Sequence, residues 1–168
     1  ADSMQIKHYS IFGLSGGAPH VLACICNNAS RIENASIISG ATPYNYKGTL
    51  KGMWFPVKLL HWFAGMRKDK QLRKFIQNDF DSLVNKPNKR MKQFQKYLPK
   101  SDKKLMIDKP EYGWDFIKGS LESYRQGIDG VVQEWKLYVS DWQMELNKIH
   151  FPITLWYGSE DKMAPAHR

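Results

Sequence analysis

Short apolar runs, bounded by turn residues, open the chain. Two of them, residues 7–12 and 35–40, flank a helix-compatible segment at residues 17–28. Short apolar runs of this kind are typical of strands buried on both faces of a parallel sheet. A strand, a helix and a second strand in this order predict a right-handed crossover connection between two parallel strands.

From residue 45 to residue 148 the apolar positions follow a helical period instead. Residues 50–66 are apolar and aromatic, and the next segment places apolar residues three and four positions apart, at Leu72, Phe75, Ile76, Phe80 and Leu83. Such spacing gives a helix one apolar face. We expect helices at 68–84, 88–98, 112–125 and 131–146, with a charged connector at 101–110.

A strand-like run returns at residues 151–157 and ends in Gly158. The chain is therefore predicted to be an α/β protein whose parallel sheet has three recognisable strands. Residues 1–44 and 149–168 would form the sheet part, and residues 45–148 an inserted, all-helical part.

Basic residues are concentrated in the predicted insertion. The formal charge is +9, and residues 47–109 contain 17 basic and 5 acidic residues. The basic residues are scattered along amphipathic helices without a recognised binding motif, which favours a solvated basic face over a nucleic-acid partner. Binding of these helices to a membrane surface is an alternative that we do not expect.

The sequence offers no metal-binding or membrane-spanning pattern. Cys24 and Cys26 are the only cysteines, and on a helix their side chains would point about 200° apart, too far to share a metal ion or a disulfide. We expect buried thiols, no metal and no cofactor. Because the chain lacks a signal-peptide pattern and an apolar run of bilayer length, we expect a cytoplasmic protein.

The most specific local motif joins the first strand to the first helix. Here Gly13-Leu14-Ser15-Gly16-Gly17 matches Gly-x-Ser-x-Gly, the pattern of a nucleophile elbow when it stands between strand and helix. Gly13 would let the turning chain pass closely, and Gly17 would let the helix pack against the strand. Ser15 would be exposed, with the Gly16 N–H beside it as a donor to an oxyanion. The alternative is a glycine-rich turn with an incidental serine.

A second candidate turn, Gly158-Ser159-Glu160-Asp161, follows the last strand. In open parallel sheets, catalytic groups gather beyond the carboxyl ends of the strands, where Ser15 is also expected. Asp161 is preferred over Glu160 because of its spacing from Gly158. The alternative is that Asp161 only caps its own turn.

These two turns, in this order and separated by an insertion of lid length, resemble the α/β-hydrolase family. Residues 126–135, Trp142 and residues 149–152 also resemble the family's return from lid to sheet. The resemblance implies a lid-bearing serine hydrolase of the esterase or peptidase kind. Ser15 would be the nucleophile, the Gly16 N–H half of the oxyanion hole, and Asp161 the acid of the triad. An ester, thioester, lactone or amide would be cleaved through an acyl-enzyme.

The aromatic start of the lid suggests a small apolar carbonyl substrate. The predicted pocket residues are Leu14, Trp54, Phe55, His61 and Trp62. Some of these side chains would instead pack the lid onto the sheet.

The family's catalytic histidine follows a further strand, and its second oxyanion donor comes from an earlier loop, so the chain resembles a central part of a hydrolase. We expect all five histidines to be structural, with His61 and His167 as alternatives for a catalytic role. The alternative functions are a non-catalytic ligand-binding or partner-binding protein and a fragment that needs a complementing chain. An oligomer would fit the second of these.

Overall fold

The computed structural model describes residues 1–166, which cluster into two compact units. The first unit contains Ala1–Trp54 and the described part of Ser140–Arg168, and the second is Phe55–Val139. Residues 45–54 and 140–148, which the sequence pattern placed in the insertion, cluster with the sheet. No helix among the described residues has an apolar stretch long enough to cross a bilayer.

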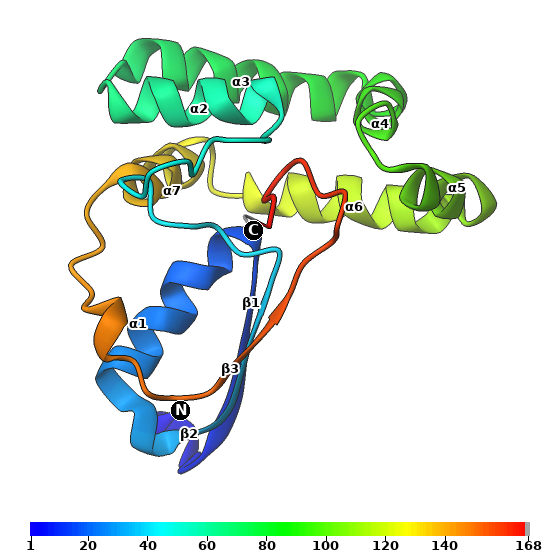
Figure 1. The fold of residues 1–168 in the computed structure, drawn as a ribbon. Coiled ribbons are helices and arrows are strands. Elements are labelled where there is room, and N and C mark those ends of the chain that lie inside the picture. The colour runs from blue at the N-terminus through cyan, green and yellow to red at the C-terminus, as the bar shows by residue number, and fades with distance from the viewer. Residues whose placement is uncertain (167–168) are drawn as a thin grey trace. The chain divides into compact units, whose positions relative to one another are not determined.

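The first unit is built on a three-stranded parallel sheet in the order β1-β2-β3 (Figure 1). The strands are β1 (Tyr9–Leu14), β2 (Ile32–Ile38) and β3 (Ile153–Trp156). In the register of the sheet, Leu14 lies beside Ile38, which in turn lies beside Trp156. All three strands therefore end at one edge, and the predicted α/β class is confirmed at this level.

Helix α1 (Ala18–Asn28) packs against one face of the sheet. The core between them consists of small and β-branched residues: Ala18, Val21, Ile25, Ile32, Ala35 and Ile37. The expectation that the first strand is buried on both faces is wrong, because Phe12 and Leu14 on the other face are 74% and 61% exposed. Short 3-10 turns complete this unit: η1 (Asp2–Met4), η2 (Ser15–Gly17), η3 (Ala29–Arg31) and η4 (Leu146–Lys148).

The two cysteines lie on the outer side of α1. Both Cys24 and Cys26 are exposed, so the prediction of buried thiols is wrong. The residues of α1 that face the sheet are Ala18, Val21 and Ile25. Neither cysteine belongs to that apolar stripe, which explains why both thiols reach solvent.

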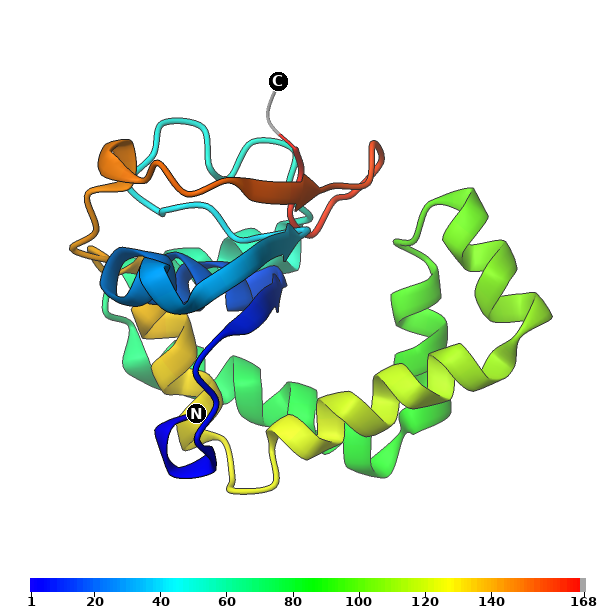
Figure 2. The same ribbon diagram turned by 90° about the horizontal axis from the view of Figure 1, so that it is seen from below.

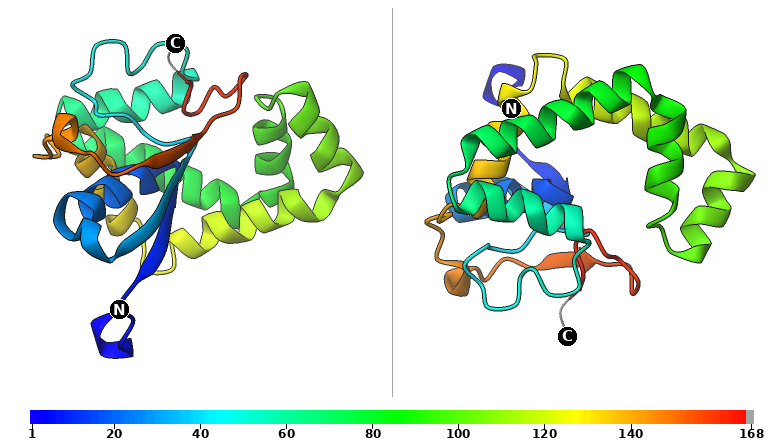
Figure 3. Two further views of the ribbon diagram at one scale, coloured as in Figure 1. Left: turned by 60° about the horizontal axis from the view of Figure 1, so that its bottom comes forward. Right: turned by 90° about the horizontal axis from the view of Figure 1, so that it is seen from above.

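The second unit contains six helices. They are α2 (Phe55–Gly65), α3 (Asp69–Asn85), α4 (Pro87–Gln95), α5 (Lys100–Asp108), α6 (Pro110–Ser123) and α7 (Asp129–Val139). Helix α3 contacts α2, α4, α6 and α7, and it contributes Leu72 and Ile76, two of the three largest fully buried side chains. Within this unit α2 and α7 lie at one end and α4 and α5 at the other (Figures 2 and 3).

Two local predictions in this unit are wrong. Most of the segment expected to be a charged connector is helix α5. The helix itself contains no glycine or proline, and its Lys104–Asp108 ion pair spans one helical turn. The helix expected to reach residue 146 ends at Val139. Just beyond it, the Asp141 carboxylate accepts a hydrogen bond from the Gln143 N–H at 3.0 Å, a local turn that competes with helix.

A partly buried ion pair ties three of these helices together. The Arg90 guanidinium donates a hydrogen bond from Nε to Asp79 Oδ1 at 2.9 Å, and its Nη2 forms an ion pair with the same oxygen at 2.7 Å. The Tyr124 hydroxyl donates to Asp79 Oδ2 at 3.2 Å. Burial, together with the Asp79 carboxylate, raises the pKa of Tyr124, so its hydroxyl keeps the proton that it donates.

Candidate active site

Ser15 stands directly after β1 with a backbone conformation that is rare for serine. Its φ is +51°, in the left-handed region, and its side chain is exposed. A non-glycine residue held there costs on the order of 1–3 kcal/mol and persists only where its surroundings fix it. The chain turns from strand to helix at this residue, as the Gly-x-Ser-x-Gly pattern predicts for an elbow.

The tight turn depends on Gly13. A Cβ atom at Gly13 would lie 2.6 Å from the Gly17 carbonyl oxygen and 2.8 Å from Val21 Cγ2. The expected role of Gly17 is wrong, however, because a Cβ atom there would meet no heavy atom within 4 Å. Only the first of these two glycines is required for the close approach of strand and helix.

Helix capping explains two of the other left-handed residues but not Ser15. Gln5 and Arg67 each close a helical turn, and the residue after each donates its N–H five positions back, to Ala1 and Phe63 respectively. Ser15 follows a strand and opens η2 instead. Its strained backbone therefore belongs to the elbow.

One peptide group connects the ends of all three strands. The peptide between Gly40 and Ala41, just beyond β2, donates its N–H to the Ser15 carbonyl at 2.9 Å. Its carbonyl oxygen accepts a hydrogen bond from the Tyr157 hydroxyl at 3.1 Å, and Tyr157 directly follows β3. Gly40 has no room for a side chain, since a Cβ atom would lie 2.3 Å from Ile37 Cγ2.

The Asp161 carboxylate organises its own turn. Its Oδ1 accepts hydrogen bonds from the N–H groups of Met163 and Ala164, at 2.7 and 3.0 Å. The capping role considered as an alternative is therefore present, and it engages one carboxylate oxygen. Ser15 and Asp161 follow the two outer strands, whose ends are two strand spacings apart, about 10 Å.

Tyr157 is a neutral hydrogen-bond donor at this edge. Burial raises the pKa of Tyr157, and the negative charge of Asp161 raises it further. The phenol therefore holds its proton at neutral pH. Tyr157 is half-buried, so its ring packs against its neighbours. The hydrogen bond from its hydroxyl to a backbone carbonyl also fixes the orientation of that peptide.

The described histidines are distributed over both units. His8 and His150 precede β1 and β3, and His20 is in the first turn of α1. His61 is 6% exposed within α2, with Nδ1 2.9 Å from the Val57 carbonyl oxygen and its ring edge-on to Trp135. Among residues 1–166, His20 is the histidine that comes soonest after a strand end, six residues beyond Leu14 of β1. His167 lies outside the described residues.

The predicted pocket residues come from both units. Leu14 and Trp54 belong to the first unit, whereas Phe55, His61 and Trp62 belong to the second. Phe55 and Trp62 are exposed, and the Lys68 Nζ lies 4.2 Å from the centre of the Trp62 ring. A shared pocket stays a prediction, and His61 is a packing residue of the helical unit.

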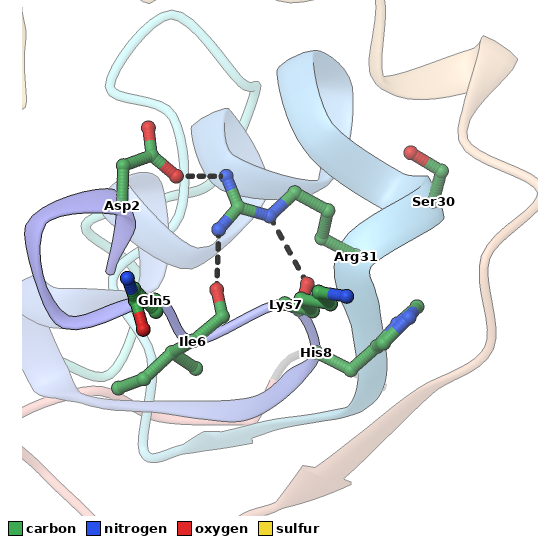
Figure 4. Close-up of a pocket in the computed structure, with 7 residues that line it drawn as sticks. All are labelled: Asp2, Gln5, Ile6, Lys7, His8, Ser30 and Arg31. Atoms are coloured by element: carbon green, nitrogen blue, oxygen red, sulfur yellow. Dashed lines mark hydrogen bonds and ion pairs between the residues drawn. The ribbon is translucent and has the colours of Figure 1, made fainter.

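A shallow hollow lies at the opposite, amino-terminal side of the sheet (Figure 4). Its central side chain is Arg31, whose nitrogens donate to the carbonyl oxygens of Lys7 and Ile6, at 3.1 and 2.6 Å, and to Asp2 at 2.7 Å. The guanidinium thus holds the N-terminal segment in place. Its donors point into these bonds, which argues against an anion site in this hollow.

Gly40 and Tyr157 were not identified as site residues from the sequence. Both carried a usable signal, since each comes directly after an apolar run and precedes a turn. Their partners in the hydrogen-bonded connection lie far away in the chain, 117 positions apart in the case of Tyr157 and Gly40. Sequence spacing alone does not reveal such a pairing.

No protein-family model, curated protein or solved structure matches this chain.

Proposed function

We propose that the chain forms part of a serine hydrolase of the α/β-hydrolase type, with Ser15 as its nucleophile. The observation that carries the proposal is the φ of +51° at Ser15, between β1 and α1, with Gly13 packed against the Gly17 backbone. Neither capping nor packing requires a serine in this conformation. A turn that exposes a hydroxyl at the carboxyl end of a parallel strand suits nucleophilic catalysis.

In this proposal Ser15 Oγ attacks the carbonyl carbon of an ester, thioester, lactone or amide. The Gly16 N–H donates a hydrogen bond to the developing oxyanion, and a base takes the hydroxyl proton and passes it to the leaving group. Water then hydrolyses the acyl-enzyme. Asp161 would orient an imidazole base through the carboxylate oxygen that accepts neither of the two turn hydrogen bonds. The exposed Leu14 beside the nucleophile favours a small apolar substrate.

A fluorophosphonate probe tests this proposal, because it reacts with an activated serine. Labelling should occur in the wild-type protein and disappear in Ser15→Ala. Ser39→Ala is the matched control, since Ser39 also has a positive φ, +45°, and follows the neighbouring strand β2. Labelling that survives Ser15→Ala, or that is absent from a folded wild-type protein, would overturn the enzyme assignment.

The second candidate function is a non-catalytic protein that binds another polypeptide. The exposed sheet face supports this alternative, because Phe12, Leu14 and Trp156 are all more than 60% exposed there. An apolar face of this kind is typical of a surface that another element or chain covers. Light scattering distinguishes the two: a monomer that carries the Ser15 label supports the enzyme, whereas an unlabelled oligomer supports the binding protein.

A further inference from the structure

We propose that Tyr157 is a positioning residue that orients and polarises the Gly16 N–H, the oxyanion donor, through two consecutive peptide groups. This inference deepens the proposed function and rests on it. Tyr157 follows β3, whereas Gly16 lies in η2 beyond β1, and the first sequence-based site did not include Tyr157. Tyr157, Gly40, Ala41, Ser15 and Gly16 all belong to the first unit.

The first half of the connection is the peptide between Gly40 and Ala41. The Tyr157 hydroxyl donates to its carbonyl oxygen at 3.1 Å. The N–H of the same peptide donates to the Ser15 carbonyl oxygen at 2.9 Å. Because a peptide group is planar and conjugated, a hydrogen bond accepted at its oxygen increases the polarity of its N–H.

The second half is the peptide between Ser15 and Gly16. Its carbonyl oxygen accepts the Ala41 N–H and also the N–H of Ala18. Its own N–H is that of Gly16, the second residue of η2, which therefore has no acceptor inside that turn. The phenol proton, the middle peptide and the elbow peptide thus form one chain of aligned dipoles that ends at the donor.

The geometry of this connection is fixed by packing. Gly40 is confined by Ile37 and Ala18, and a Cβ atom at Gly40 would also lie 3.1 Å from the Tyr157 hydroxyl oxygen. The middle peptide therefore has little freedom to rotate away from either partner. Each bond in such a chain is strengthened by about 10–30% by its neighbour, and the plane of the elbow peptide is fixed by its two accepted bonds.

Tyr157→Phe removes the hydroxyl and keeps the ring. We expect the rate of fluorophosphonate labelling of Ser15 to fall about 3- to 10-fold, less than the 100-fold or greater loss on deleting an oxyanion donor. Tyr124→Phe is the matched control, because it removes a buried phenol hydrogen bond in the second unit. Its labelling rate should stay at the wild-type value.

A second readout does not depend on catalysis. In ¹H–¹⁵N spectra, Tyr157→Phe should shift the amide proton resonances of both Ala41 and Gly16 upfield, and Tyr124→Phe should shift neither. Replacing Tyr157 by 3-fluorotyrosine, at a pH where the phenol is protonated, makes it a stronger donor and should shift both resonances downfield. This variant keeps the ring and hydroxyl, so it serves where Tyr157→Phe does not fold.

The outcomes separate this inference from the proposed function. Unchanged Gly16 resonances in both Tyr157 variants would overturn the inference, even where Ser15 is labelled. An upfield Gly16 shift in Tyr157→Phe and a downfield shift with 3-fluorotyrosine, without labelling of Ser15, would support the hydrogen-bonded connection. The same result would overturn the proposal that the chain is a serine hydrolase. If Tyr124→Phe slowed the labelling of Ser15 as much as Tyr157→Phe does, the effect would reflect a general loss of stability. That result would also overturn the positioning role of Tyr157.

Discussion

Gly13→Ala is the substitution that tests the elbow most directly. The added methyl group would lie 2.6 Å from the Gly17 carbonyl oxygen and 2.7 Å from its carbonyl carbon. Both are backbone atoms at the start of α1, so no side-chain rotation relieves the overlap. The helix must move away from the strand, at the position where Ala18 and Val21 are packed against the sheet.

The expected cost is about 3 kcal/mol, the upper end of the range for inserting a methyl group into a packed interior. With a urea dependence of about 2 kcal/mol per molar, this cost lowers the unfolding midpoint of the first unit by about 1.5 M. Near-ultraviolet circular dichroism and tryptophan fluorescence report the transition. The same displacement should greatly slow the labelling of Ser15.

Gly17→Ala provides the matched control, four residues along the same turn. Its φ is −72°, and an added Cβ atom would meet no heavy atom within 4 Å. Replacing glycine by alanine at a compatible position stabilises by about 0.4–1 kcal/mol, through the unfolded chain. Equal midpoints for Gly13→Ala and Gly17→Ala would refute the close approach that defines the elbow.

Three further substitutions test other parts of the structure. Ser15→Gly should abolish labelling yet raise the thermal midpoint of the first unit, because glycine relieves about 1 kcal/mol of strain at a φ of +51°. Asp79→Ala should destabilise the second unit by about 2 kcal/mol in urea unfolding, because it leaves the half-buried Arg90 without its partner. Asp115→Ala, which removes an exposed ion pair, should change the stability little. Burial lowers the pKa of His61 in the folded protein below 6.5. As the pH drops, the unfolded chain therefore takes up a proton before the folded protein does. The stability of the second unit should fall below about pH 6.5 and level off below the folded pKa. His61→Phe should flatten this dependence of stability on pH. An unchanged dependence would contradict the role of His61 as its source.

The sequence was sufficient for the features that local periodicity encodes. Three apolar runs became three parallel strands, and the helical spacing of Leu72 and Ile76 became the buried face of α3. The strand limits moved by about two residues, because pairing partners decide where a strand ends. Gly13 and Leu14 extend β1 since both align with β2.

Burial was the harder property to predict. An apolar run such as Tyr9–Phe12 fits a strand covered on both faces, but only the face toward α1 is covered, and Phe12 is exposed. Conversely, charge alone suggested a connector where α5 forms. The exposure of Phe12 could not be predicted from the sequence, because it depends on which distant elements pack against the strand. Helix α5, which has no buried residue, could have been recognised from its local composition.

The candidate site likewise combines residues that local motifs identify with groups that only the folded structure brings together. Ser15, Gly16 and Asp161 came from short motifs, because each motif contains the residues that form its own turn. The peptide between Gly40 and Ala41 belongs to neither motif, yet it is the group that bonds to Ser15 and to Tyr157. A strained residue persists only where other groups hold it, and here those groups come from two other strands. The conformation of Ser15 therefore depends on the carboxyl ends of all three strands, and substitutions beyond β2 and β3 should also alter the reactivity of Ser15, although less than changes inside its own motif.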